Sequence, residues 1–87
     1  VARMAEVLGM PTTVHISGGL GFMYMLHFAS YTPDIGRYQE YKRGIERYCD
    51  WFDPALEIRD GSLSVPNGPG TGVRDIRAIV EGAKRVE

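Results

Sequence analysis

His15 is the side chain of this sequence best suited to acid–base chemistry. It lies near the end of the short stretch formed by residues 11–17, and two glycines follow at residues 18–19. If residues 12–16 form a strand, His15 lies on its polar face, because side chains alternate along a strand. An imidazole exchanges protons near neutral pH, and parallel β/α folds place their chemistry at the carboxyl ends of strands. These residues alone leave two interpretations open: a catalytic histidine, and a buried histidine satisfied by a backbone group.

Glu40 is the second candidate for acid–base chemistry. Residues 38–42 are predicted to form a short strand on which Glu40 and Lys42 share one face. This strand follows the first after about one strand–helix–strand unit, so His15 and Glu40 would lie on neighbouring strands. A carboxyl group beside an imidazole forms a general acid–base pair. Without other information the residues favour the alternative, in which Glu40 forms a structural salt bridge with Lys42 or Arg37.

A glycine-rich loop at residues 18–21 follows the first predicted strand and precedes an apolar helix. Because the N–H groups at the start of a helix favour anions, we expect Ser17 and Gly18 to contact an anionic or hydroxylated group of a substrate. The loop matches neither the dinucleotide fingerprint nor the P-loop, which needs a lysine followed by serine or threonine. It therefore gives little support for nucleotide binding.

The remaining candidate residues favour structural roles. His27 lies within the apolar helix expected over residues 22–31, where a lone histidine is typical of a hydrogen-bonded core residue. Cys49 has no cysteine or histidine partners at zinc-ligand spacing. Asp50 and Asp53 lack further oxygen ligands at a suitable spacing. We therefore assign no metal ligand within this chain.

The elements that would position His15 and Glu40 alternate along the first half of the chain. The pattern predicts a helix, a strand, a helix and a strand in that order, over residues 1–8, 12–16, 22–31 and 38–42. Alternating helices and strands are typical of an open parallel α/β sheet or a β/α barrel. The second helix is apolar on nearly every side, which predicts that it is buried on most of them.

A β-hairpin is predicted in the second half of the chain. Residues 56–59 and 62–65 alternate apolar and polar about Asp60 and Gly61, a dipeptide that favours a two-residue hairpin turn. Residues 66–72 are rich in glycine and proline and predict an irregular loop. Apolar residues at helical spacing near the end of the chain predict a closing amphipathic helix.

The composition narrows the classes of function. With 87 residues, a net charge of −1 and scattered basic residues, the chain has room for one small domain and no footprint for nucleic acid or an anionic membrane. No apolar run approaches the length of a membrane span, and the single cysteine fits a reducing cytoplasm. A helical pattern that begins at Val1 without a capping residue predicts that the sequence belongs to a longer protein.

Two motifs resemble those of a known family. The first consists of Gly-Met-Pro at residues 9–11, His-Ile-Ser-Gly-Gly at 15–19 and Tyr-Gln-Glu at 38–40. The second, nearer the end of the chain, consists of Val-Pro at 65–66 and Gly-Pro-Gly-Thr-Gly-Val at 68–73. Together they resemble the C-terminal part of the mandelate racemase/muconate lactonizing enzyme family of the enolase superfamily. The resemblance covers almost the whole chain and is closest to the mandelate racemase-like branch that includes acid-sugar dehydratases.

The resemblance implies an α/β fold, the C-terminal fragment of a modified (β/α)7β barrel of the TIM type. Residues 1–47 would form its last helix–strand units. Residues 48–87 would form a hairpin, a loop and a helix that return toward an N-terminal capping domain. His15 would end the seventh strand as the general base, and Glu40 would end the eighth and donate a hydrogen bond or proton to an enediolate oxygen.

The reaction implied by the resemblance is abstraction of a proton α to a carboxylate in a Mg²⁺-dependent enzyme. Such an enzyme would be a lyase or isomerase, namely a sugar-acid (hydroxy-acid) dehydratase or an epimerase or racemase. The metal ligands, and the aspartate that pairs with the histidine, would come from earlier strands, so the isolated 87 residues are not expected to be active. The implied partners are a small carboxylate substrate, the rest of the enzyme and further copies in a cytoplasmic homo-oligomer. The alternative is a non-catalytic α/β module that serves only in assembly.

Overall fold

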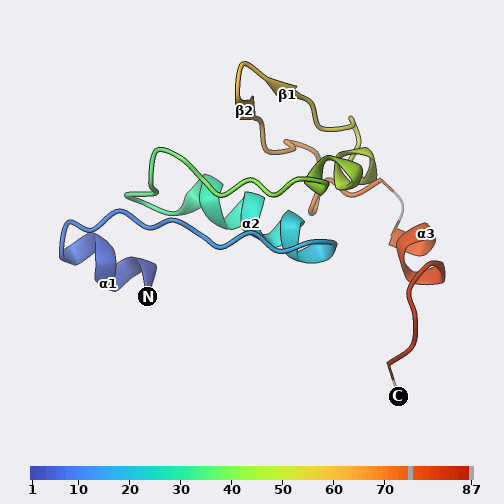
Figure 1. The fold of residues 1–87 in the computed structure, drawn as a ribbon, viewed down its shortest axis with the longest axis horizontal. Helices are drawn as coiled ribbons and strands as arrows, with labels where there is room; N and C mark the ends of the chain where they lie inside the picture. The colour runs from blue at the N-terminus through green and yellow to red at the C-terminus, as the bar shows by residue number, and fades with distance from the viewer. Residues whose placement is uncertain (75, 87) are drawn as a thin grey trace. The chain divides into compact units, whose positions relative to one another are not determined.

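The chain forms two compact units in the computed structural model, which describes residues 1–74 and 76–86 (Figure 1). The first unit is Val1–Tyr48 and the second is Cys49–Glu87. Both candidate residues, His15 and Glu40, belong to the first unit. Among the described residues, no helix is both long and apolar enough to cross a membrane.

Two α-helices of the first unit lie where the sequence predicts them. α1 spans Ala2–Val7 and α2 spans Leu20–Tyr31. α2 starts two residues earlier than expected, directly after the glycine-rich loop, and its C-terminal cap is Thr32. The Thr32 hydroxyl donates a hydrogen bond to the Phe28 carbonyl at 2.5 Å. This bond satisfies one of the carbonyls that the end of a helix leaves without a partner.

α2 supplies most of the core of the first unit. Its buried side chains are Phe22, Met23, Met25 and Leu26, and the flanking segments add Ile16 and Ile45. Tyr24 and Tyr31 on the same helix are 63% and 69% exposed, and His27 is half-buried. α2 is therefore buried along the side that faces the core, as predicted, but it is exposed at these two tyrosines, where the prediction is wrong.

The prediction of two strands, at residues 12–16 and 38–42, is wrong for this structure. In the described part of the first unit, the parallel pairing is limited to an isolated bridge between Thr12 and Ile35. Gly36 N donates to Thr12 O at 2.7 Å beside this bridge. The two segments then continue as extended chain without a ladder, alongside each other over α2 (Figure 1).

Side chains replace the missing ladder between these segments. Val14 N donates to the Gln39 side-chain oxygen at 3.1 Å, and Ile16 N donates to the Glu40 carboxylate at 2.7 Å. A parallel ladder requires alternate amides, those that face the neighbouring strand, to meet main-chain carbonyls of that strand. Because side-chain oxygens take these amides, the two backbones do not pair and neither segment becomes a strand.

The second unit contains the antiparallel sheet of the molecule's described part, made of β1 (Ile58–Arg59) and β2 (Ser62–Leu63). Asp60 and Gly61 join the strands with φ values of 49° and 71°, the two positive angles that a type I′ turn requires. The sheet therefore forms at the predicted turn. Each strand has two residues, fewer than predicted, because the side chains of β1 are exposed and provide no packed face to extend the pairing.

Phe52 anchors the second unit beyond the 3₁₀-helix η1 (Ile45–Trp51). Its side chain is 1% exposed, and its backbone forms an isolated antiparallel bridge with Val73. Next to this bridge, the main-chain amide of Asp53 donates a hydrogen bond to the Gly72 carbonyl at 2.9 Å. The closing helix predicted from the sequence is present as α3 (Ile76–Glu81).

We expect Gly72→Ala to destabilise the second unit more than Gly70→Ala does. Both glycines have positive φ values, 74° and 66°, and alanine at such an angle costs about 1–2 kcal/mol. A Cβ at Gly72 would also overlap Pro66, whereas a Cβ at Gly70 would meet nothing within 4 Å. Overlap in a packed region adds about 1–3 kcal/mol. Urea unfolding of the two variants measures the difference, and equal free energies of unfolding would contradict the prediction.

Candidate active site

A close approach next to the Thr12–Ile35 bridge brings the two candidate segments together. A Cβ at Gly36 would overlap the Thr13 hydroxyl oxygen, so glycine permits this approach. Gln39 then links the segments, since its Nε2 donates to Gly36 O at 2.7 Å while its Oε1 accepts from a main-chain amide of the other segment. Gln39 was not predicted as a site residue, and its signals in the sequence were its position next to Glu40 and its place in the Tyr-Gln-Glu motif.

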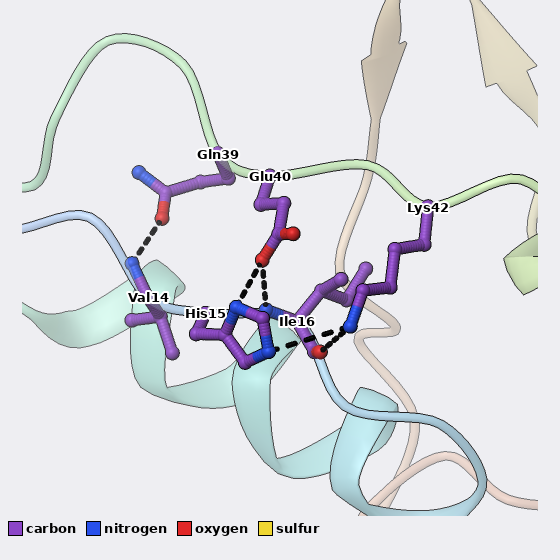
Figure 2. A network of polar contacts seen from close by, with 6 residues as sticks. All are labelled: Val14, His15, Ile16, Gln39, Glu40 and Lys42. Atoms are coloured by element: carbon purple, nitrogen blue, oxygen red, sulfur yellow. Dashed lines mark hydrogen bonds and ion pairs between the residues drawn. The ribbon is translucent and has the colours of Figure 1, made fainter.

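The structure brings His15 and Glu40 into direct contact. The distance from His15 Nδ1 to Glu40 Oε2 is 2.8 Å, and the same oxygen accepts the Ile16 amide at 2.7 Å (Figure 2). The imidazole is 78% exposed and the carboxylate side chain 35% exposed. The interpretation of His15 as a buried, backbone-satisfied histidine is therefore wrong for this structure, in which a carboxylate fixes the ring.

The contact with Glu40 determines the tautomer of the His15 ring. A carboxylate oxygen is an acceptor, so Nδ1 carries the proton and donates it to Oε2. In the neutral ring the lone pair then lies on Nε2, at the opposite side of the imidazole. His15 thus presents a proton acceptor that faces away from Glu40, which is the arrangement that orients a general base.

Lys42 contacts the free nitrogen of this imidazole. Its Nζ lies 3.3 Å from His15 Nε2 and 3.5 Å from Ile16 O (Figure 2). Arg37 stacks over the Tyr38 ring with its guanidinium carbon 5.3 Å from the ring centroid. The salt bridge of Glu40 with Lys42 or Arg37, which the residues alone favoured, is therefore wrong for the described structure, in which the Glu40 carboxylate contacts His15 instead.

Ser17 and Gly18 follow directly after this network, and both are exposed. Ser17 lies against the first turn of α2, since a Cβ at Gly21 would be 2.6 Å from Ser17 Oγ. A Cβ at Gly18 would be 2.9 Å from the Tyr48 hydroxyl oxygen. The two residues thus lie two and three positions after His15 in the chain. Their contact with a substrate stays a prediction.

Comparison with known proteins adds the family of the chain. A family model described as enolase C-terminal domain-like matches residues 1–77. The chain belongs to this family. No curated protein and no solved structure matches the chain significantly. Members of the enolase superfamily are enzymes, so the family places this enolase C-terminal-like domain in an enzyme superfamily. The acid-sugar dehydratase branch and the complete barrel go beyond this match.

The described side chains of this enolase C-terminal-like domain do not form a metal-binding cluster. Within residues 1–74 and 76–86, no group of three or more histidine, cysteine, aspartate or glutamate side chains lies close enough to hold a metal ion. Glu40 Oε2 already accepts two N–H donors. These residues do not by themselves fit a Mg²⁺ ion, which prefers several oxygen ligands, and we assign no chemical step to one here.

The segment after Lys42 is held by a second carboxylate. Glu46 Oε2 accepts the Tyr41 hydroxyl at 2.9 Å and the Gly44 amide at 3.0 Å. Its own main-chain amide, followed by the Tyr41 hydroxyl, lowers the pKa of Glu46 below its ordinary value of 4.5. Tyr41 and Gly44 flank Lys42, so this carboxylate orders the stretch from which the lysine reaches His15.

We expect these Glu46 contacts to be lost on acidification. Because the pKa of Glu46 is lower in the folded chain, its stabilising effect is complete above about pH 4.5 and disappears as the pH falls through the lowered folded value. The Gly44 amide resonance, followed by ¹H–¹⁵N NMR, should titrate with a midpoint below 4.5. In Glu46→Gln this transition should vanish. A midpoint at or above the ordinary value would contradict the prediction.

Proposed function

We propose that this domain is part of a Mg²⁺-dependent enolase-superfamily enzyme that abstracts a proton α to a carboxylate. The most fitting reaction is that of a sugar-acid or hydroxy-acid dehydratase, or of an epimerase or racemase. The observation that carries the proposal is the 2.8 Å contact between His15 Nδ1 and Glu40 Oε2. The membership of the chain in the enolase C-terminal domain-like family supports it.

His15 is the proposed general base. In one direction its Nε2 takes the α-proton of the substrate, and in an epimerisation it can instead deliver a proton to the α-carbon from its own face after a second base has removed the original proton from the other face. In a dehydration, the imidazolium formed in this way gives its proton to the departing β-hydroxyl group. The 78% exposure of the side chain leaves Nε2 accessible to a substrate once Lys42 shifts.

Glu40 is the proposed second catalytic residue. Its Oε2 already accepts His15 Nδ1–H, so the carboxylate orients the ring and stabilises the positive charge that the ring acquires with the substrate proton. The family resemblance implies a different contribution, a hydrogen bond or proton from Glu40 to the enediolate oxygen. The two contributions predict different effects of replacing Glu40 by glutamine and by alanine.

The remaining parts of the proposed site come from outside these contacts. Ser17 and Gly18 are the proposed contacts for a hydroxyl or anionic group of the substrate, because they follow His15 and are exposed. The proposed Mg²⁺ ligands belong to other strands of the whole enzyme, which also includes a capping domain and forms a homo-oligomer.

The proposal is tested by screening the full-length enzyme against sugar acids in D₂O with Mg²⁺ present. We expect at least one acid to exchange its α-hydrogen for deuterium or to lose water to a keto acid, both followed by ¹H NMR. Heat-inactivated enzyme is the control for chemical exchange. A folded enzyme that neither exchanges nor converts any α-hydroxy acid in the panel would overturn the proposal.

A further inference from the structure

We infer that Lys42 is the carboxylate-binding residue of this site and holds the substrate with its α-carbon at His15 Nε2. The inference rests on the proposed function and adds to it a residue that determines which substrates bind. It starts from the network in Figure 2, where Lys42 is the cation that approaches the free side of the imidazole.

The contacts of Lys42 leave its ammonium group incompletely bonded. An ammonium has three N–H donors, and the described structure gives two acceptors, His15 Nε2 at 3.3 Å and Ile16 O at 3.5 Å. Both acceptors are neutral and both distances are long for hydrogen bonds. The side chain is exposed, so an incoming ligand can replace these contacts at little cost.

The charge of Lys42 is also not neutralised by an ion pair within the described residues. The carboxylate nearest to it in the sequence, Glu40, directs its Oε2 to His15 Nδ1 instead. Two other cations of the first unit are engaged. Arg37 lies over the Tyr38 ring, and Arg47 donates to the hydroxyl of its neighbouring tyrosine at 2.7 Å. An unpaired cation beside the free nitrogen of an oriented imidazole favours an anionic ligand at that position.

The distance between Lys42 Nζ and His15 Nε2 suits an α-hydroxy carboxylate. The α-hydrogen and the carboxylate oxygens of such a molecule are carried by adjacent carbon atoms. A base that takes the hydrogen and a cation that holds an oxygen must therefore lie side by side, within a few ångströms. Nζ now contacts Nε2 at 3.3 Å, and a carboxylate that draws Nζ away from the ring frees Nε2 to face the α-hydrogen of the same molecule.

Lys42 then acts on the charge that the reaction creates. His15 Nε2 forms a bond to the α-hydrogen as the C–H bond breaks, and its electron pair becomes the new carbon–carbon double bond. The electrons displaced from the carboxylate collect on its oxygens, one of which is bonded to the Lys42 ammonium. The proton stays on the imidazolium, whose Nδ1–H still points at Glu40 Oε2. Lys42 therefore stabilises the enediolate more than the substrate, because the negative charge beside it increases.

The test measures binding of 2-hydroxyisobutyrate to the full-length enzyme by NMR titration. This acid has an α-hydroxyl group and a carboxylate but no α-hydrogen, so it binds without reacting. We expect Lys42→Met to weaken its binding about tenfold, which corresponds to ~1.4 kcal/mol. Lys42→Arg should retain most of the affinity. Arg43→Met, which removes the neighbouring exposed cation, should change the affinity less than about twofold.

The neutral amide of the same acid separates carboxylate binding from a general disturbance of the site. We expect Lys42→Met to leave the weak binding of 2-hydroxyisobutyramide unchanged. An equal loss for acid and amide, an unchanged affinity for the acid, or no binding of the acid to the unsubstituted enzyme would overturn the inference. Because the assay needs no turnover, its result is independent of the deuterium-exchange screen that tests the proposed function.

Discussion

Full-length enzyme carrying His15→Asn is expected to lose turnover by a factor of about 10²–10⁴. Asparagine keeps an N–H donor that can reach Glu40 Oε2, which now lies 2.8 Å from His15 Nδ1. It has no nitrogen lone pair in place of Nε2, so it cannot take the α-proton. The rate constant kcat for the best substrate of the sugar-acid screen, together with α-hydrogen exchange in D₂O, measures the loss.

The fold of the His15→Asn variant should be unchanged, because the imidazole is 78% exposed and contributes little to the core. Circular dichroism and thermal melting check this. His27→Asn is the matched control, since His27 lies on α2 and has no proposed catalytic part, and its kcat should stay close to that of the unsubstituted enzyme. Near-normal turnover by a folded His15→Asn enzyme would remove His15 from the catalytic machinery.

The second large effect is expected from Glu40→Gln. Glutamine keeps an oxygen that can accept the His15 and Ile16 N–H groups, but it lacks the charge that stabilises the imidazolium. We expect kcat to fall about 10²–10⁴-fold, as when the carboxylate beside a catalytic histidine is replaced by an amide. Glu6→Gln is the matched control, because Glu6 pairs with Arg3 on α1 and not with His15, and it should retain nearly full activity.

Comparing Glu40→Gln with Glu40→Ala separates the two contributions proposed for this residue. If Glu40 orients His15 and stabilises its charge, both variants lose the charge and both are strongly impaired. If Glu40 instead donates a hydrogen bond to the enediolate oxygen, the glutamine amide can donate in its place. Glu40→Gln would then be much more active than Glu40→Ala. Steady-state kinetics of the two purified variants decide between these contributions.

The helices and the turn of this domain could be predicted because their causes are local. Residues 22–31 are apolar on nearly every side, which predicted a buried helix, and α2 forms there. Asp60 and Gly61 are suited to the positive φ values of a type I′ turn, and β1 and β2 meet at that turn. The strands at 12–16 and 38–42 could not be excluded, because alternation does not report which atoms accept the amides of Val14 and Ile16.

The contact between His15 and Glu40 could be predicted from the expected path of the chain. One strand–helix–strand unit returns the chain to the side of its earlier segment, and the two segments do lie together even though they are not strands. The approach of Lys42 to His15 Nε2 was missed, because its charge favoured Glu40 as a partner. The available signal was its position two residues after Glu40, on the same face of an extended segment.

Glu40 Oε2 holds the imidazole of His15 and the main-chain amide of Ile16, the next residue, at the same time. One carboxylate oxygen thus fixes the position of the ring and of the main chain next to it. If residues 39–40 shift slightly relative to residues 14–16, rotation of the Glu40 side chain about its χ angles can keep Oε2 near both donors, so the distance from acid to base changes less than the distance between the two backbones. The pair can thus keep its alignment through small shifts between the two segments. A side-chain acceptor therefore gives this site a tolerance to motion that direct pairing of two backbones would not provide.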